Sequence, residues 1–340
     1  MSGVRPRVLR GPAAAGHPAA EAWASGGRSR PLPERLEVWR EKPTHDPASV
    51  YRLVFRDRSP GSVFVKRCRA EGAGAERLCY EEILPDLDLS SPVYHGSLAA
   101  ADGTWWFFIE DVGRRRLSPR DPAHRALASR WLGRLHRLCT RHAAARRLPP
   151  AGASRYLAHL HSGRARIRRH LDNPALTAAD LDVLSRVLAV QDRVEERWAA
   201  IERSCVGPFE TLVHGDFRPK NVRVRDERSG PVLYALDWEL AGWGPPMVDL
   251  APARGAIGAS QVEPEPYLAE LGELAAGLDA ERLSRLRDLG HLFRRLAAID
   301  WDTTHLHFQD PECLVGPIAS LHVLHRALGR ALERAERWLA

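Results

Sequence analysis

The chain has no long hydrophobic run and few cysteines. Nowhere in its 340 residues does an apolar stretch approach the roughly 18 residues of a membrane-spanning helix, so we expect no membrane partner. The 5 cysteines are scattered, and no two of them form a Cys-x-x-Cys pair. This pattern argues against a disulfide framework or a cysteine zinc site. It favours reduced thiols and a cytoplasmic location.

The first 32 residues lack the sequence features of a folded segment. They are rich in Ala, Gly, Pro and Arg, and Glu21 is their only acidic residue. They also lack the continuous apolar block of a secretory signal. Because such a composition buries little apolar surface, we expect residues 1–32 to be a disordered tail.

The formal charge of +7 does not indicate a nucleic-acid partner, because the positive charge is unevenly distributed. Residues 260–340 contain 13 acidic residues and 9 arginines but no lysine. A basic chain with an acidic C-terminal segment does not form one continuous face that could follow a phosphate backbone. We therefore expect no nucleic-acid binding.

Two short motifs carry most of the functional information. The first, residues 214–221, reads His-Gly-Asp-Phe-Arg-Pro-Lys-Asn and places Asp216 five residues before Asn221. The second, residues 236–239, reads Leu-Asp-Trp-Glu and adds Asp237 sixteen residues after Asn221. One carboxylate to accept a hydroxyl proton, with an Asn and an Asp to hold Mg²⁺, is what an ATP-dependent phosphotransferase requires.

The residues between the motifs predict a β-hairpin. Residues 222–225 alternate apolar and charged side chains, residues 226–230 are turn-like, and residues 232–236 read as a returning strand. A hairpin centred on Ser229 would pair Asn221 with Asp237. Antiparallel partners lie about 5 Å apart, so both side chains could ligate one ion.

These motifs resemble the aminoglycoside phosphotransferase and choline kinase family, whose pattern of His-Gly-Asp, four residues and Asn is present. The resemblance implies a two-lobed, protein-kinase-like α+β fold, with a nucleotide-binding lobe at residues 33–113 and a catalytic and acceptor-binding helical lobe at 114–340. It also implies ATP, or GTP, and Mg²⁺ as cofactors. Asp216 would be the catalytic base, with Arg218 beside the transferring phosphoryl group. Asn221 and Asp237 would bind the metal.

The resemblance also assigns nucleotide-binding residues in the first lobe. Lys66 ends the apolar strand at residues 62–66 and matches the lysine that pairs the α- and β-phosphates. Glu76 is the best match for its acidic partner, ahead of Glu81 and Glu82, whose helical phase differs. The segment 106–113 resembles the hinge, where backbone groups at 110–112 would receive the adenine. The nucleotide-binding candidates are therefore Lys66, Glu76, Ser49, Glu110 and Val112.

Helical periodicity dominates after residue 113. Apolar residues recur at helical spacing over residues 127–138, 183–201 and 283–296, and a last helix covers residues 321–339. These stripes indicate core positions. His136 lies beside the first of them and reads as a packed histidine.

Asp249 matches a residue of the family that supports the catalytic loop, and helix capping is its simplest role. Residues 300–312 are acidic and contain no Lys or Arg. Asp300 and Asp302 are therefore candidates for attracting an ammonium-bearing acceptor, with a solvated acidic loop as the alternative.

The sequence favours a small-molecule kinase acting on an antibiotic or secondary metabolite. A metabolic kinase of an amino alcohol, sugar or homoserine-like acceptor is the alternative, and an inactive kinase-like binding protein is a further one. A protein kinase would carry a glycine-rich phosphate loop and an Ala-Pro-Glu segment, and both are lacking. We expect a monomer or homodimer whose partner is a small hydroxyl compound.

Overall fold

A computed structural model of the chain describes residues 6–27, 30–40, 48–56, 60–206, 209–251 and 262–339. The chain divides into two compact units. The first comprises Met1–Leu117 and Pro219–Ala241, and the second comprises Ser118–Arg218 and Gly242–Ala340.

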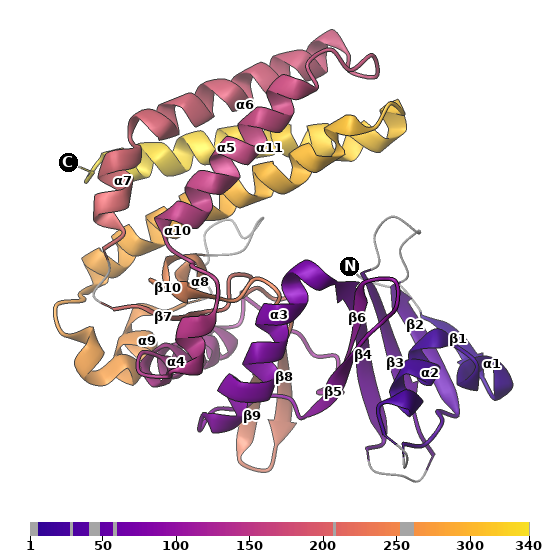
Figure 1. Cartoon of the computed structure of the whole chain (residues 1–340). Helices are drawn as coiled ribbons and strands as arrows, with labels where there is room; N and C mark the ends of the chain where they lie inside the picture. Colours follow the sequence, from indigo (N-terminus) through magenta and orange to yellow (C-terminus); the bar gives the residue numbers. More distant parts are fainter. Residues whose placement is uncertain are drawn as a thin grey trace. The chain divides into compact units, whose positions relative to one another are not determined.

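The first unit is built on strands. In chain order it contains β1 (Arg7–Arg10), α1 (Pro12–Ala15), α2 (Pro18–Ser25), β2 (Arg35–Arg40), β3 (Ser49–Val54), β4 (Ser62–Arg69), α3 (Ala70–Leu78), a π-helical turn (Cys79–Ile83), a 3-10 turn (Leu84–Asp86), β5 (Tyr94–Ala99), β6 (Thr104–Glu110), β8 (Val222–Glu227) and β9 (Gly230–Ala235) (Figure 1).

The main sheet of this unit is antiparallel, with six strands in the order β1-β2-β3-β4-β6-β5. The predicted strands around residues 36–39, 51–55, 62–66 and 106–109 correspond to β2, β3, β4 and β6. Because side chains alternate across a strand, Val63 and Val65 of β4 face one side of the sheet and Lys66 faces the other. The first side is the core. The second carries the polar residues of the candidate site.

The prediction that residues 1–32 form a disordered tail is wrong for most of that segment. Strand β1 pairs with β2, and helix α2 lies against the core side of the sheet (Figure 1). Trp23 is 3% exposed, and its ring lies 5.7 Å from that of Phe55 and 5.5 Å from that of Phe108. Its indole N–H donates to the Pro31 carbonyl at 3.0 Å.

Composition misled the prediction for a physical reason. Helix α2 buries Ala19, Ala20 and Ala22 beside Trp23, and small side chains allow its backbone to approach the sheet closely. One tryptophan supplies the large apolar surface that anchors the helix. His17 caps the helix by accepting from the Ala19 amide, and Pro18 occupies the first helical position, where proline is well tolerated.

The hairpin of β8 and β9 belongs to the first unit, although the sequence analysis assigned it to the second. The Val224 amide donates to the Arg115 carbonyl at 2.9 Å, and the Ser90 hydroxyl donates to the Leu233 carbonyl at 2.6 Å. These contacts join segments that are far apart in the chain. Chain order alone could not reveal them.

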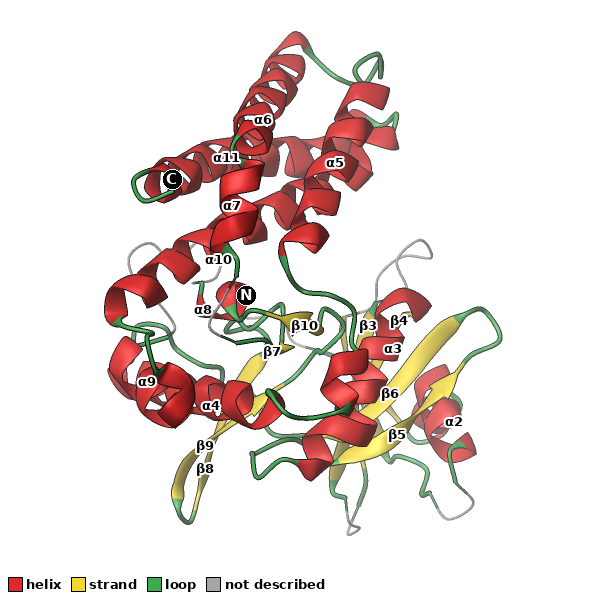
Figure 2. Ribbon diagram, turned by 60° about the vertical axis from the view of Figure 1, so that its left-hand side comes forward, coloured by secondary structure: helices red, strands yellow, loops and turns green. Residues whose placement is uncertain are grey.

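The second unit is mainly helical (Figure 2). It contains α4 (Pro122–Cys139), a 3-10 turn (Ala144–Arg147), α5 (Ala153–Arg169), α6 (Ala178–Glu196), α7 (Trp198–Ser204), β7 (Thr211–Val213), β10 (Gly242–Gly244), α8 (Met247–Leu250), α9 (Pro264–Leu271), a 3-10 turn (Gly272–Ala275), α10 (Ala280–Thr303), a 3-10 turn (Thr304–His307) and α11 (Pro311–Glu336).

Amphipathic packing holds this unit together. Helix α10 packs on both α5 and α11, and α11 packs on α6. Tyr156 of α5 stacks on Phe293 of α10, with the ring centroids 4.3 Å apart. The helical stripes predicted around residues 127–138, 183–201, 283–296 and 321–339 supply buried residues of α4, α6, α7, α10 and α11. Within the described ranges, no helix is both long and apolar enough to cross a membrane.

The buried tryptophan of α2 provides a test of the N-terminal packing. We predict that Trp23→Ala lowers the free energy of unfolding by about 3–5 kcal/mol, because it removes a large buried ring from a packed core. Urea unfolding followed by circular dichroism measures the change. Trp301→Ala is the matched control, since Trp301 is 41% exposed, and it should cost much less. Equal effects of the two substitutions would contradict this packing.

Candidate active site

Lys66 is the centre of a charged cluster in the first unit. Its ammonium lies 2.8 Å from the Glu76 carboxylate and 3.0 Å from that of Glu239, and it also contacts Asp237. Glu76 comes from α3, the helix that follows the lysine strand, as predicted. Its side chain is 1% exposed, so its charge is almost fully removed from water. The pairing predicted between Lys66 and Glu76 is present in the structure.

Charge compensation keeps the lysine protonated. Burial alone would lower the pKa of Lys66, but Glu76, Asp237 and Glu239 together raise it well above its ordinary value. Burial also raises the pKa of Glu76, and the nearby ammonium opposes that rise. Three carboxylates around one ammonium leave an excess of negative charge, which favours a further cation at this place.

Asp237 reaches the cluster through an unusual backbone conformation. Strands β8 and β9 pair Val222 with Ala235, and the Leu236 amide donates to the Asn221 carbonyl at 2.8 Å. Asn221 is therefore opposite Leu236, one residue short of the predicted partner Asp237. The turn has two residues, Arg228 and Ser229, and is not centred on Ser229 alone.

A slip of one residue would normally turn a side chain to the other face of the ribbon. Asp237 avoids this outcome because its φ is 71°, the only positive φ of a non-glycine among the described residues. Such a conformation costs of order 1–3 kcal/mol and is typical of functional positions. It re-aims the carboxylate toward Lys66.

The donor set suits a hard divalent cation. Ligand oxygens of Glu76, Asp237 and Glu239 lie within 4.8 Å of one another. Asn221 is buried at the start of the hairpin, opposite Leu236. Mg²⁺ prefers such oxygen ligands, usually one or two carboxylates with substrate phosphates. The residues present therefore fit the predicted metal. Glu239, the last residue of the second motif, is the additional carboxylate.

The face of β4 that carries Lys66 also carries Phe64, two residues earlier and half-buried. Ser49 does not share this face. Val50 pairs with Lys66 across the ladder, so its neighbour Ser49 points to the opposite side, where it is buried. The predicted phosphate contact of Ser49 is therefore wrong. Residues 44–47 of the proposed phosphate loop lie outside the described residues.

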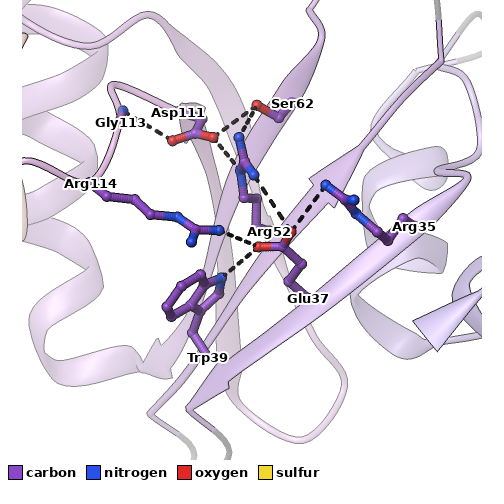
Figure 3. Close-up of polar contacts among 8 residues, drawn as sticks. All are labelled: Arg35, Glu37, Trp39, Arg52, Ser62, Asp111, Gly113 and Arg114. Carbon is purple, nitrogen blue, oxygen red and sulfur yellow. Dashed lines mark hydrogen bonds and ion pairs between the residues drawn. The ribbon is translucent and has the colours of Figure 1, made fainter. Parts of the chain in front are cut away.

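A polar network fixes the chain after β6 (Figure 3). Asp111 accepts from Ser62 at 2.8 Å and from the Gly113 amide at 3.1 Å, and it pairs with Arg52. Buried Glu37 of β2 accepts from Arg114 at 2.9 Å. The hinge-like segment is thus anchored to β2, β3 and β4.

The two predicted hinge positions differ in what they offer. The Glu110 amide already donates to the Val93 carbonyl at 2.8 Å, and its side chain pairs with Arg225 at 2.6 Å. Val112 is buried. Backbone groups after Glu110 are therefore better placed to receive the adenine than the Glu110 amide, whose N–H is already used.

Asp216 lies in the second unit and is nearly buried. Its backbone amide donates to His214 Nδ1 at 3.3 Å, and its carboxylate lies 2.6 Å from Arg218 Nε. The next residue, Phe217, is fully buried and stacks on Trp131 of α4. Packing on one side and an ion pair on the other hold this carboxylate in one orientation.

Asp249 braces the loop from α8. Its carboxylate accepts from the backbone amides of His214 at 2.6 Å and Gly215 at 2.9 Å. Gly215 has a φ of 79°, which a side chain would disfavour. The capping role expected for Asp249 is wrong: Pro246 is the N-cap residue of α8, and the carboxylate is used by the loop. His136, fully buried, hydrogen-bonds the Tyr267 hydroxyl at 2.8 Å, so its prediction as a packed histidine is confirmed.

Arg294 was missed by the sequence reasoning. Its Nε donates to the Val248 carbonyl at 2.8 Å, and its Nη1 lies 3.8 Å from the Asp216 carboxylate. A signal was available in the pattern of α10. Gly290 and Ala297 lie four residues before and three residues after Arg294, and both are buried. An arginine on a buried helical stripe indicates a specific partner.

The acidic segment predicted to bind an acceptor is largely neutralised within the second unit. Asp300 is buried at the end of α10, where it pairs with Arg166 and lies 2.8 Å from His159 Nδ1. Asp302 accepts a hydrogen bond from the Ser320 hydroxyl. Residues 300–303 are helical, so the alternative of a solvated acidic loop is wrong for this part of the segment.

A model of the phosphotransferase enzyme family matches residues 34–283, which is most of the chain. The match contains both motifs, the lysine strand and helix α3. No curated protein matches the sequence at a significant level.

Solved structures share the fold at low sequence identity. The GDP and kanamycin complex of APH(2″)-IIIa has a TM-score of 0.59 and 14% identity, over 90% of this chain and 97% of that chain. Choline kinase from Cryptosporidium parvum Iowa II has a TM-score of 0.56 and 10% identity, over 89% and 92% of the two chains. Ethanolamine kinase from Plasmodium vivax has 0.54 and 13%, over 87% and 81%. Likeness at this identity shows a common kinase-like α+β fold, as predicted.

The bracing of the loop by Asp249 can be tested through stability. We predict that Asp249→Asn lowers the free energy of unfolding at neutral pH by about 1–3 kcal/mol, because an amide group must face one of the two backbone donors. Asp288→Asn, which affects a partly exposed ion pair with Arg334, is the matched control and should cost less. Urea unfolding measures both.

The same effect has a predicted pH dependence. Burial would raise the pKa of Asp249, but hydrogen bonds and charge from His136 and His214 lower it below its ordinary value. A depressed pKa gives stability that is complete above the unfolded-state value of about 3.9 and is lost as the pH falls through the folded-state value. The difference between the parent and Asp249→Asn should therefore be constant at neutral pH and shrink in acid. A difference that grows on acidification would contradict this account.

Proposed function

Because the chain belongs to the phosphotransferase enzyme family, we propose that it transfers the γ-phosphate of ATP, or GTP, to a hydroxyl group of a small molecule, with Asp216 as the general base. The enzyme class, a kinase acting on small-molecule hydroxyl groups, follows from the family itself. The nucleotide, the metal and the roles of individual residues are our proposal.

One observation carries the assignment of roles, namely that the two motif aspartates have different surroundings. Asp216 is held by Arg218 and by the loop that Asp249 braces, and it belongs to no group of three or more metal-ligating side chains among the described residues. Asp237 lies with Lys66, Glu76 and Glu239. A lone oriented carboxylate suits proton transfer, whereas a carboxylate cluster with a lysine suits metal and phosphate binding.

The chemical step needs only these groups and the two substrates. The acceptor hydroxyl gives its proton to Asp216, and its oxygen forms a bond to the γ-phosphorus. The bond from that phosphorus to the β–γ bridging oxygen breaks, and the nucleoside diphosphate leaves with the bonding electron pair. Arg218, next to Asp216, would neutralise charge on the transferring phosphoryl oxygens.

The first unit would bind and orient the nucleotide. Lys66 would exchange part of its carboxylate contacts for the α- and β-phosphates, while Glu76 keeps its ammonium in place. Asp237 and Asn221 would hold Mg²⁺, with Glu239 in reach of the same ion. The ion supplies charge neutralisation on the phosphates. Phe64, on the same face as Lys66, offers an apolar surface for the purine base of the nucleotide.

An inactive binding protein is disfavoured by the intact charge network. A scaffold has no use for a buried Lys66 surrounded by carboxylates or for the strained backbone of Asp237, and both carry energetic costs. The acceptor expected from the motifs is a hydroxylated antibiotic or secondary metabolite, with a metabolic amino alcohol, sugar or homoserine-like compound as the alternative. An ADP-release assay against a panel of both kinds tests the proposal.

Two substitutions should separate the roles of the aspartates. We predict that Asp216→Asn reduces kcat by at least about 1000-fold and changes the affinity for MgATP by only a few-fold, because the shape is kept and the proton acceptor is lost. Asp237→Ala should weaken nucleotide binding in the presence of Mg²⁺ much more than in its absence. ADP release and calorimetric nucleotide titration measure the two effects.

Asp226→Asn is the matched control, since Asp226 lies on the same hairpin with a 70% exposed side chain, and it should behave like the parent. Near-parental kcat in Asp216→Asn would remove it as the base. Equal loss of Mg²⁺-dependent binding in Asp216→Asn and Asp237→Ala would contradict the division of roles.

A further inference from the structure

Arg294 has hydrogen-bonding capacity that the described part of the protein does not use. Its side chain is only 13% exposed. Nε donates to the Val248 carbonyl, and Nη1 lies 3.8 Å from Asp216, which is longer than a hydrogen bond. Nη2 is buried and has no acceptor among the described residues. A buried guanidinium donor without a partner is costly, so this nitrogen points to a missing acceptor.

The neighbourhood of Arg294 is rich in cations. Arg218 flanks Asp216 from the catalytic loop, and Arg155 acts with Arg294 on the Tyr156 hydroxyl. The negative charge of Asp249 is already engaged by two backbone amides. On the same helix, the pKa of His291 is lowered to about 3. Burial is the largest cause, and Arg295 and other nearby arginines add to it. Arg218 and Arg294 therefore both face the Asp216 carboxylate, and Asp249 is the other carboxylate that acts on Arg294.

Carboxylates that could receive a cationic acceptor are used elsewhere in this unit. Asp300 forms internal pairs with Arg166 and His159, and Asp302 accepts from Ser320. An ammonium-bearing acceptor would thus meet the guanidinium groups of Arg218 and Arg294 beside the base. Like charges near one another in a poorly hydrated site repel strongly.

From this arrangement we propose that the acceptor is a hydroxyl compound that also carries an anionic group, a carboxylate or a phosphate, and that Arg294 binds this group beside Asp216. The inference rests on the proposed phosphotransferase function and adds the charge class of the acceptor to it. A guanidinium binds both anions through paired N–H donors in a fixed geometry.

Binding the anion at Arg294 would also position the reacting hydroxyl. Arg294 and the base belong to the same unit, and Arg294 Nη1 lies 3.8 Å from the Asp216 carboxylate. An acceptor held at one end by Arg294 presents a hydroxyl a few bonds away to Asp216. Burial lowers the pKa of Arg294, and the charges of Asp216 and Asp249 oppose that shift.

Three alcohols of equal length test the charge class on the unmodified protein. Butane-1,4-diol, 4-hydroxybutyrate and 4-aminobutan-1-ol carry the same hydroxyl and differ only in the neutral, anionic or cationic group at the far end. We expect the carboxylate to be preferred by about tenfold or more in kcat/KM for ADP release, because one charge-assisted hydrogen bond contributes about 1.5–3 kcal/mol. Glycerol 3-phosphate against glycerol distinguishes a phosphate from a carboxylate as the preferred anion.

Variants of Arg294 link the preference to the residue. Arg294→Met should reduce the preference of carboxylate over diol to near unity and leave KM for ATP within a few-fold, and Arg294→Lys should restore part of the preference. Arg285→Met is the matched control, because Arg285 is an exposed arginine on the same helix paired with Glu281. It should keep the parental preference. Ligand-observed NMR measures binding of each alcohol even where turnover is slow.

The outcomes separate this inference from the function on which it rests. A preference for the diol or the amino alcohol, a carboxylate preference that survives in Arg294→Met, or no detectable binding of either anionic compound would overturn the inference. Phosphotransfer to any of these alcohols would still support the proposed function. The opposite outcome is that the carboxylate binds in an Arg294-dependent way but no hydroxyl compound gives ADP release. That result would support the anion site and contradict the proposed phosphotransferase role of Asp216.

Discussion

A buried ammonium that is balanced by three carboxylates is the interaction on which the first unit depends. Lys66 lies on the polar side of the sheet, and Glu76, Asp237 and Glu239 reach it from a helix and from the segment after the hairpin. Removing the Lys66 ammonium would leave three carboxylates without their cation in a poorly hydrated place. The cluster therefore links strand β4, helix α3 and the Asp237 segment electrostatically. The same excess of carboxylates makes the place suitable for a divalent ion and for phosphates.

The second unit solves a different problem, which is to hold one carboxylate still. Asp216 is oriented by backbone hydrogen bonds made elsewhere in its loop: Asp249 fixes the two preceding amides, and Gly215 adopts the conformation that those bonds require. Fixed orientation matters for proton transfer, because a displacement of about 1 Å can cost 100-fold in rate. On the proposed roles, the carboxylate cluster of the first unit binds metal and phosphates, and the braced loop of the second unit orients Asp216 for proton transfer.

Sequence patterns predicted the features that are encoded locally. The strand carrying Lys66, the helix carrying Glu76 and the helical stripes follow from periodicity, and the fold follows from the motifs. The failures share one cause, which is that the deciding contact is distant in sequence or depends on backbone detail. Trp23 is buried by strands much farther along the chain, and the true register of the hairpin depends on a two-residue turn in place of the five turn-like residues expected. The conformation of Asp237 that compensates for the shift cannot be read from residue types.

Residues 260–340 show why the amino-acid composition of a segment does not predict the local electrostatic potential. Residues 260–340 carry more acidic residues than arginines, yet the carboxylates of Asp300, Asp288 and Glu336 are paired with arginines of neighbouring helices. What a bound molecule experiences is set by the charges left after such internal pairing. Arg294, whose buried Nη2 has no acceptor in the described ranges, contributes more to the field at Asp216 than several paired carboxylates at a distance. On the proposed roles, the charges left uncompensated next to Asp216 determine which acceptor binds, and Arg294 makes that charge positive.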